Sequence, residues 1–144
     1  MAWRRVLWYW GPVVGYAALI FFLSSLSAPG LAAPFLRLPF GDKILHAGVY
    51  GGMALLALRA FRHAAGARGE RSALVLAVAT SVLYGMSDEF HQFFVPQRHP
   101  ELWDLAADAL GAVMATWLWT RMTGTATMAA APRLPNLGVT NRVG

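Results

Sequence analysis

The chain has 144 residues, of which 57% are hydrophobic and only 13% charged, and its mean hydropathy is +0.46. This balance excludes an ordinary soluble domain and predicts an integral membrane protein. Cysteine is absent, which excludes disulfides and thiolate metal sites, and the formal net charge of +5 is distributed in a way that indicates membrane topology. No nucleic-acid motif accompanies that charge, so no nucleic-acid partner is expected.

Four apolar stretches follow one another along the chain, and about 20 apolar residues are enough for a helix to cross a bilayer. The third stretch ends in SDEFHQ, and the fourth contains Asp104 and Asp108. We predict an all-α membrane protein, a four-transmembrane-helix bundle, with helices over residues 6–26, 44–61, 72–95 and 102–122.

The predicted transmembrane domain covers residues 1–122, and a tail follows it. Residues 123–144 contain Gly, Pro, Thr and Asn without apolar periodicity, which predicts a disordered tail.

Basic residues are distributed unequally between the two sides of this bundle. One side carries nine arginines against a single acid, Glu70, whereas the other holds Arg37, Lys43 and Arg98 against six acids. The positive-inside rule places the arginine-rich side, both termini and the tail in the cytoplasm. Because arginine, alanine and glycine are abundant, as in proteins of GC-rich bacteria, we expect a multi-pass protein of the bacterial inner membrane. The alternative is that MAWRR and the apolar run after it form a cleaved signal peptide.

Polar side chains gather toward the predicted outer side of three of the helices. Asp42, His46 and Tyr50 are spaced by four residues and share one face of the second helix, while Asp104 and Asp108 share a face of the fourth. Gly111 continues that face and allows a neighbouring helix to approach closely. The third helix carries a matching stripe, and His91 lies off it; the stripe comprises Tyr84, Gly85, Asp88, Glu89 and Gln92.

These side chains predict a shared polar site. A charge at the bilayer centre costs at least ~2.5–3.5 kcal/mol, so charged groups within helices should face the bundle interior and pair there. The expected ligand-binding residues are Asp42, Lys43, His46, Glu89, Gln92, Arg98, Asp104 and Asp108. Among them we expect Glu89 to hold Arg98 over the site through a guanidinium–carboxylate pair.

The residues that carry this pattern resemble the VanZ-like family of small bacterial membrane proteins. The matching segments are DKILHAGVY at residues 42–50 and DEFHQFFVPQRHPELWDLAADALG at residues 88–111. Two positions depart from it, since many members have Gly where Gln97 stands and Asn where Asp108 stands. The resemblance implies a four-helix membrane protein. The founding member is associated with low-level teicoplanin resistance, which should not be assumed here. The family at large has no established reaction.

Several functions fit these residues. The main hypothesis is binding of a polar or anionic headgroup of an envelope lipid or a lipid-linked cell-wall precursor, with Lys43 and Arg98 contacting phosphate or carboxylate and the acids contacting amino groups. A second is a membrane-embedded hydrolase or transferase with His46 or Glu89 as the general base. A third is a membrane scaffold or small transporter.

Two other interpretations of the site stay open. Glu89, Arg98 and Asp104 could form an ion-pair network that only fixes helix packing. His46, Glu89 and Asp108 could instead bind a metal ion, but no metal motif such as HExxH is present, so neither a metal nor another cofactor is expected.

Overall fold

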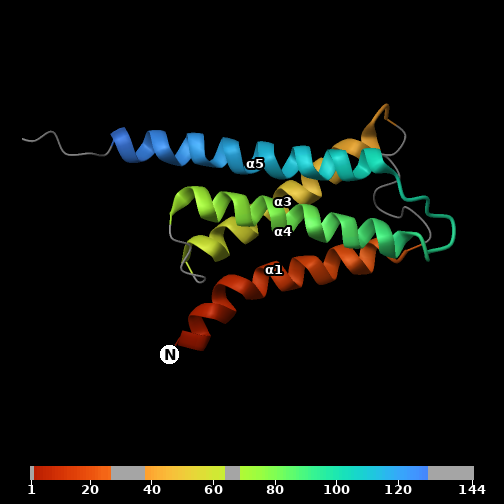
Figure 1. The fold of residues 1–144 in the computed structure, drawn as a ribbon, viewed down its shortest axis with the longest axis horizontal. Helices are drawn as coiled ribbons and strands as arrows, with labels where there is room; N and C mark the ends of the chain where they lie inside the picture. The colour runs from red at the N-terminus through yellow and green to blue at the C-terminus, as the bar shows by residue number, and fades with distance from the viewer. Residues whose placement is uncertain (1, 27–37, 64–68, 130–144) are drawn as a thin grey trace, which may run out of the picture.

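The computed structural model describes residues 2–26, 38–63 and 69–129, with side chains from 3 to 123. Four long helices account for its regular structure: α1 (Ala2–Ser24), α3 (Gly41–His63), α4 (Glu70–Gln92) and α5 (Leu102–Ala129). They run alongside one another, and the start of α1 and the far end of α5 lie at the same end (Figure 1). The predicted all-α membrane bundle is therefore confirmed.

Three of the helices are long and apolar enough to cross a membrane by length and composition: Trp3–Ser24, Gly41–His63 and Glu70–Gln92. The long α5 is not among them, because Asp104, Asp108 and Arg121 reduce its apolar character. Large apolar side chains such as Phe22 and Ile44 are 61% and 62% exposed, as expected for a surface that faces lipid. The fourth transmembrane crossing stays a prediction.

The end of α5 lies beyond its predicted position. The helix was expected to stop at Met122, where the apolar pattern fades, but it continues through Ala129. The helix thus continues into the predicted tail, whose boundary with the transmembrane domain stays a prediction, and residues 130–144 lie outside the described part of the chain.

Helix α3 is the centre of the bundle and contacts each of the other three helices. Its closest neighbour is α5, because small residues spaced by four on both helices remove side chains from the contact. A Cβ on Gly51 would lie 3.1 Å from the carbonyl oxygen of Gly111, and one on Gly111 would overlap the backbone of Ala47. The close approach expected at Gly111 is thus confirmed.

The loop between α4 and α5 contains a residue in a left-handed conformation. Gln97 has a φ of 66°, a region that glycine occupies without steric cost. This explains why glycine suits the same position in the VanZ-like pattern.

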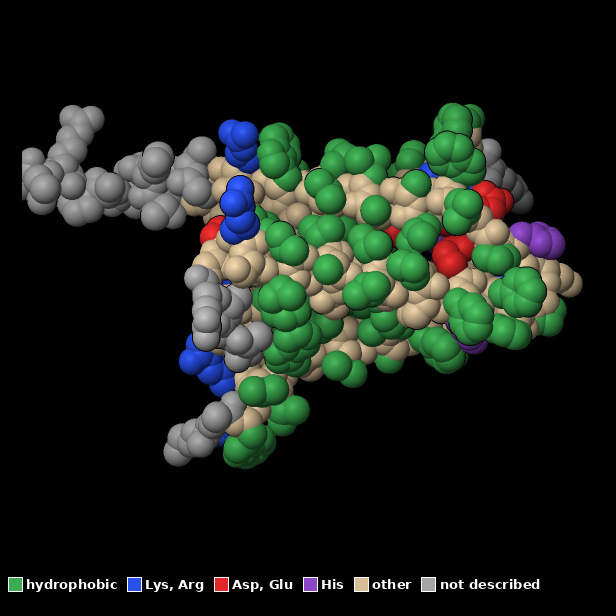
Figure 2. Space-filling model, in the orientation of Figure 1, with side chains coloured by type: hydrophobic (Ala, Val, Ile, Leu, Met, Phe, Trp, Pro, Cys, Tyr) green, Lys and Arg blue, Asp and Glu red, His purple; other side chains and the backbone are tan. Residues whose placement is uncertain are grey.

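The two ends of the bundle differ in charge. Figure 2 shows Lys and Arg side chains mainly at the end where α1 begins and Asp, Glu and His side chains mainly at the opposite end, with apolar side chains between. We call these the arginine-rich end and the acidic end. By the positive-inside rule we expect the arginine-rich end to be the cytoplasmic one.

Reporter fusions test this orientation. Alkaline phosphatase, which is active only outside the cytoplasm, should be active when fused after Gln97 in the α4–α5 loop and inactive when fused after Gly69 before α4. Both junctions lie outside helices, so neither fusion interrupts one. The reverse pattern of activities would place the acidic end in the cytoplasm.

Candidate functional site

All four helices contribute side chains to a polar cluster at the acidic end. The C-terminal ends of α1 and α4 meet the N-terminal ends of α3 and α5 there, so residues far apart in sequence become neighbours. We use the name polar cluster for Ser24, Asp42, Lys43, His46, Asp88, Glu89, Gln92, Glu101, Asp104 and Asp108.

Lys43 joins α3 to the start of α5. Its Nζ lies 2.8 Å from Oδ2 of Asp42, 2.7 Å from Oε2 of Glu101 and 2.6 Å from Oδ1 of Asp104. An ammonium has three N–H donors, and here each has a carboxylate partner. Lys43 therefore has no donor left for an anionic ligand.

His46 lies one turn further into the bundle. Its Nδ1 is 3.0 Å from Oδ1 of Asp108, and its Nε2 is 3.9 Å from Oδ2 of Asp104, which is too long for a hydrogen bond. The side chain of Asp108 is fully buried, whereas that of His46 is 19% exposed. Asp108 thus orients the imidazole from the bundle interior, and the opposite edge of the ring faces the acids near the surface.

Asp88 connects α1 to α4. Its Oδ1 accepts a 2.6 Å hydrogen bond from the hydroxyl of Ser24, and its Oδ2 accepts one of 3.0 Å from the amide of Gln92. Both hydrogen bonds are buried from water, and each carboxylate oxygen accepts from a protein donor. This part of the cluster is satisfied and serves packing.

Glu89 and Asp108 are only half satisfied. Oε2 of Glu89 accepts a 3.0 Å hydrogen bond from the backbone N–H of Glu101, but its Oε1 is buried without a partner, as is Oδ2 of Asp108. The exposed fractions of the two residues are 9% and 0%. A buried carboxylate oxygen without a donor is costly, which singles out this region as a place that a ligand could complete.

The expected pair of Arg98 with Glu89 is wrong. The Nε of Arg98 donates to the carbonyl oxygen of Leu26 over 3.2 Å at an exposed position, while Glu89 accepts from the backbone of the α4–α5 loop. The direction of the loop after Val95 could not be predicted from the sequence, and it carries Arg98 toward the end of α1. Seven of the eight expected site residues lie in the cluster, and Arg98 lies at its edge.

The expected site residues did not include Ser24 or Glu101. Serines near a helix end usually satisfy only backbone, and Ser24 does so at Phe21 while also donating to Asp88. Glu101 precedes α5 and had no periodic signal, although its position three residues before Asp104 could have suggested it. His91, expected to lie off the stripe, instead joins α4 to α1: its Nε2 is 2.9 Å from the hydroxyl of Ser25.

Two sets of side chains could hold a metal ion, although the sequence predicted none. His46, Glu89 and Asp104 each offer one atom within 4.8 Å of the others, and so do Asp42, Glu101 and Asp104. The second set is already bridged by the ammonium of Lys43. In the first set only Asp104 contacts Lys43, so that set is the more open of the two to a ligand.

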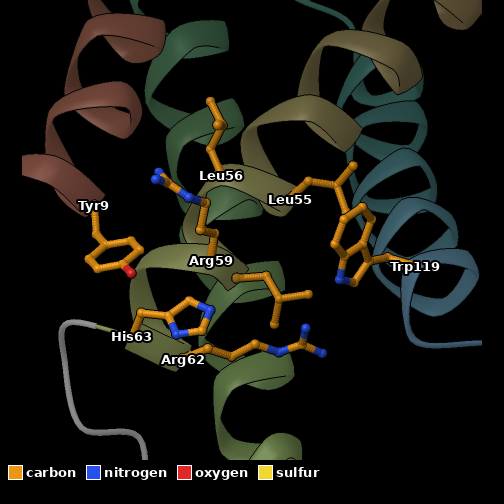
Figure 3. A pocket seen from close by; sticks show the side chains of 8 residues that line it. Tyr9, Leu55, Leu56, Arg59, Arg62, His63 and Trp119 are labelled. Carbon is orange, nitrogen blue, oxygen red and sulfur yellow. The ribbon is translucent and has the colours of Figure 1, made fainter. Parts of the chain in front are cut away.

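A groove of about 380 Å³ lies at the opposite, arginine-rich end (Figure 3). Arg62 pairs with Glu70 through its Nη2 while its Nε is buried without a partner, Arg59 lies 4.7 Å from the ring centre of Tyr9, and Tyr9 stacks on His63. The groove is thus mainly an apolar hollow between helices. It is lined by Tyr9, Leu55, Leu56, Leu58, Arg59, Arg62, His63 and Trp119.

One comparison with known proteins identifies a family. A family model described as VanZ/LLP1 matches residues 3–123, which include the four helices as far as the structure describes their side chains. No curated protein and no solved structure matches the chain.

Proposed function

The chain belongs to the VanZ/LLP1 family and is a membrane protein of that type, and from this premise we propose that the polar cluster binds the polar headgroup of an envelope lipid or of a lipid-linked cell-wall precursor. We place the protein in the bacterial inner membrane with the cluster at the outer leaflet. The arginine bias supports this orientation.

The observation that carries this proposal is the pair of buried carboxylate oxygens without a donor, Oε1 of Glu89 and Oδ2 of Asp108. A cluster that served packing alone would satisfy its buried acceptors, as Asp88 does through Ser24 and Gln92. The cluster also lies where a headgroup would be, at one end of an apolar bundle, rather than midway along it.

The balance of charge favours a neutral or cationic part of the headgroup over an anionic one. The cluster holds six carboxylates, and its one lysine already contacts three of them. Contact of Lys43 with phosphate, expected from the sequence, therefore has no support. Arg98, whose Nε bonds to the carbonyl oxygen of Leu26 at an exposed position, remains the expected contact for a phosphate.

Native mass spectrometry of the protein purified in mild detergent tests the proposal. The wild type should carry one headgroup class enriched over its share of the membrane, and Asp108→Asn should reduce its occupancy about tenfold, because a charged acceptor is lost. Glu70→Gln removes one carboxylate at the other end and should retain the lipid. Identical, bulk-like lipid in all three proteins would contradict headgroup binding.

A second candidate function is a membrane-embedded hydrolase or transferase, favoured by one observation. The 3.0 Å contact between Nδ1 of His46 and Asp108 orients the imidazole as in general-base catalysis, with Nε2 directed away from the orienting carboxylate. Release of a headgroup or acyl product from added lipid, abolished by His46→Gln, would support catalysis. Unchanged lipid would leave binding as the function.

A further inference from the structure

We infer that the group bound at the polar cluster is a primary ammonium, and that three acceptors hold it: Nε2 of His46, Oε1 of Glu89 and Oδ2 of Asp104. This inference rests on the proposed function and narrows its ligand to headgroups that carry an amine. From Lys43 and Arg98 the sequence predicted contact with an anionic group, whereas this inference gives the bound group a positive charge.

The first step is the tautomer of His46. A carboxylate only accepts hydrogen bonds, so the 3.0 Å contact with Asp108 requires a proton on Nδ1. In the neutral imidazole, Nε2 is then an acceptor. In that tautomer it faces Oδ2 of Asp104 over 3.9 Å, which is too long for a hydrogen bond, so both atoms can accept from a donor placed between them.

The second step is the carboxylate of Glu89. Its one bonded oxygen is held by the backbone N–H of Glu101, which fixes the carboxylate in place. Its other oxygen is buried without a donor in a residue that is only 9% exposed. Glu89 therefore has one acceptor without a donor, and one of its carboxylate oxygens lies within 4.8 Å of ligand atoms of both His46 and Asp104.

The third step is distance. An ammonium that donates three hydrogen bonds of ~2.8 Å in tetrahedral directions places its acceptors about 4.6 Å apart. One atom each of His46, Glu89 and Asp104 lie within 4.8 Å of one another, and the measured Nε2–Oδ2 distance is 3.9 Å. A zinc ion with bonds of ~2.0–2.2 Å would need its ligands about 3.4 Å apart. The 3.9 Å between Nε2 and Oδ2 lies between these two values, so the three side chains are close enough to contact one cation, and the choice of an ammonium rests on the charge and access described next.

The fourth step is charge and access. Lys43 cannot fill this position, because its Nζ is held by three other oxygen atoms, including Oδ1 of Asp104. The side chains of His46 and Asp104 are 19% and 12% exposed, so the space borders the surface near the start of α3 and α5. A headgroup amine could enter there while its acyl chains stay along the apolar outside of the bundle.

Competition among lipids that differ only in the headgroup tests the inference. The delipidated protein would be incubated with equal amounts of phosphatidylethanolamine, phosphatidylcholine and phosphatidylglycerol with identical chains, and native mass spectrometry would measure retention. We expect phosphatidylethanolamine to be retained at least tenfold over the other two. The choline headgroup is a particularly sharp comparison, since it has the same positive charge but no N–H donor.

Matched variants connect the preference to the three acceptors. Glu89→Gln keeps an acceptor but removes the charge, and it should reduce phosphatidylethanolamine retention about tenfold, whereas Glu70→Gln at the other end should leave it unchanged. Unfolding midpoints of the variants would show that both remain folded.

Displacement of the lipid by soluble phosphoethanolamine would show that the amine headgroup alone is recognised. Failure to displace it would show that the attached lipid is needed; either result keeps the ammonium.

Other outcomes separate the two proposals. Retention of phosphatidylglycerol or phosphatidylcholine that depends on Glu89 would overturn the ammonium but leave headgroup binding in place. Retention that does not depend on headgroup or on Glu89 would overturn both. Stoichiometric zinc or magnesium in the delipidated protein, lost in Glu89→Gln, would replace the ammonium with a metal ion.

Discussion

Replacing Gly111 with alanine is expected to lower the free energy of unfolding by about 2–3 kcal/mol, a large effect for one methyl group. The added Cβ would overlap the backbone carbonyl of Ala47, which cannot rotate away as a side chain can. Helices α3 and α5 would have to separate, and the contacts of Lys43 and His46 with α5 would lengthen with them. The unfolding midpoint in detergent, followed by tryptophan fluorescence, measures the effect.

Gly48→Ala is the matched control, because it adds the same methyl group on α3 where no atom lies within 4 Å. Alanine has the higher helix propensity by up to ~1 kcal/mol, so this variant should be as stable as the wild type or slightly more stable. Equal midpoints for Gly111→Ala and Gly48→Ala would show that the close approach of α3 and α5 contributes nothing to stability.

Lys43→Met is expected to destabilise the protein by about 2 kcal/mol, because three carboxylates would then face one another without a cation. The cost is below the ~3–5 kcal/mol of a fully buried broken pair, since the Lys43 side chain is 22% exposed and water can partly screen the acids. Addition of salt should recover part of the loss. The measurement is the unfolding midpoint at low and high ionic strength.

Two companion variants check the cause of that loss. Lys43→Arg keeps the positive charge and should cost less than the methionine variant. Lys43→Met combined with Glu101→Gln removes one of the three repelling charges and should regain stability relative to Lys43→Met alone. A methionine variant as stable as the wild type would mean that the network around Lys43 is fully solvated.

Helical spacing predicted that the acidic residues and the histidine of α3 and α5 turn toward each other at the acidic end. Asp42 and His46 are four residues apart on α3, Asp104 and Asp108 four apart on α5, and the cost of charge in lipid directs both pairs inward. The resulting contacts, Lys43 with Asp104 and His46 with Asp108, join helices about 60 residues apart in sequence. Contacts that depend only on helical spacing could therefore be predicted from the sequence.

The predictions that failed concern segments without helical periodicity. Arg98 lies in a loop, and the path of a loop is set by tertiary contacts such as the one with Leu26, so its expected partner Glu89 was wrong. Glu101 contributes through its backbone as well as its side chain, which no side-chain pattern reveals. The end of α5 at Ala129 was missed because apolar periodicity stops before the helix does.

The separation in sequence between Lys43 and its partners has a consequence for biogenesis. The ribosome completes α3 with its lysine and imidazole long before it makes Glu101 and Asp104, which lie 58 and 61 residues later than Lys43. Until α5 is made, Lys43 has Asp42 as a carboxylate partner but lacks the other two, and a charge that is only partly paired is costly near the bilayer. The stable pairing of α3 therefore depends on the last helix to be made, and a chain that stops before α5 would lack two of the three partners of Lys43.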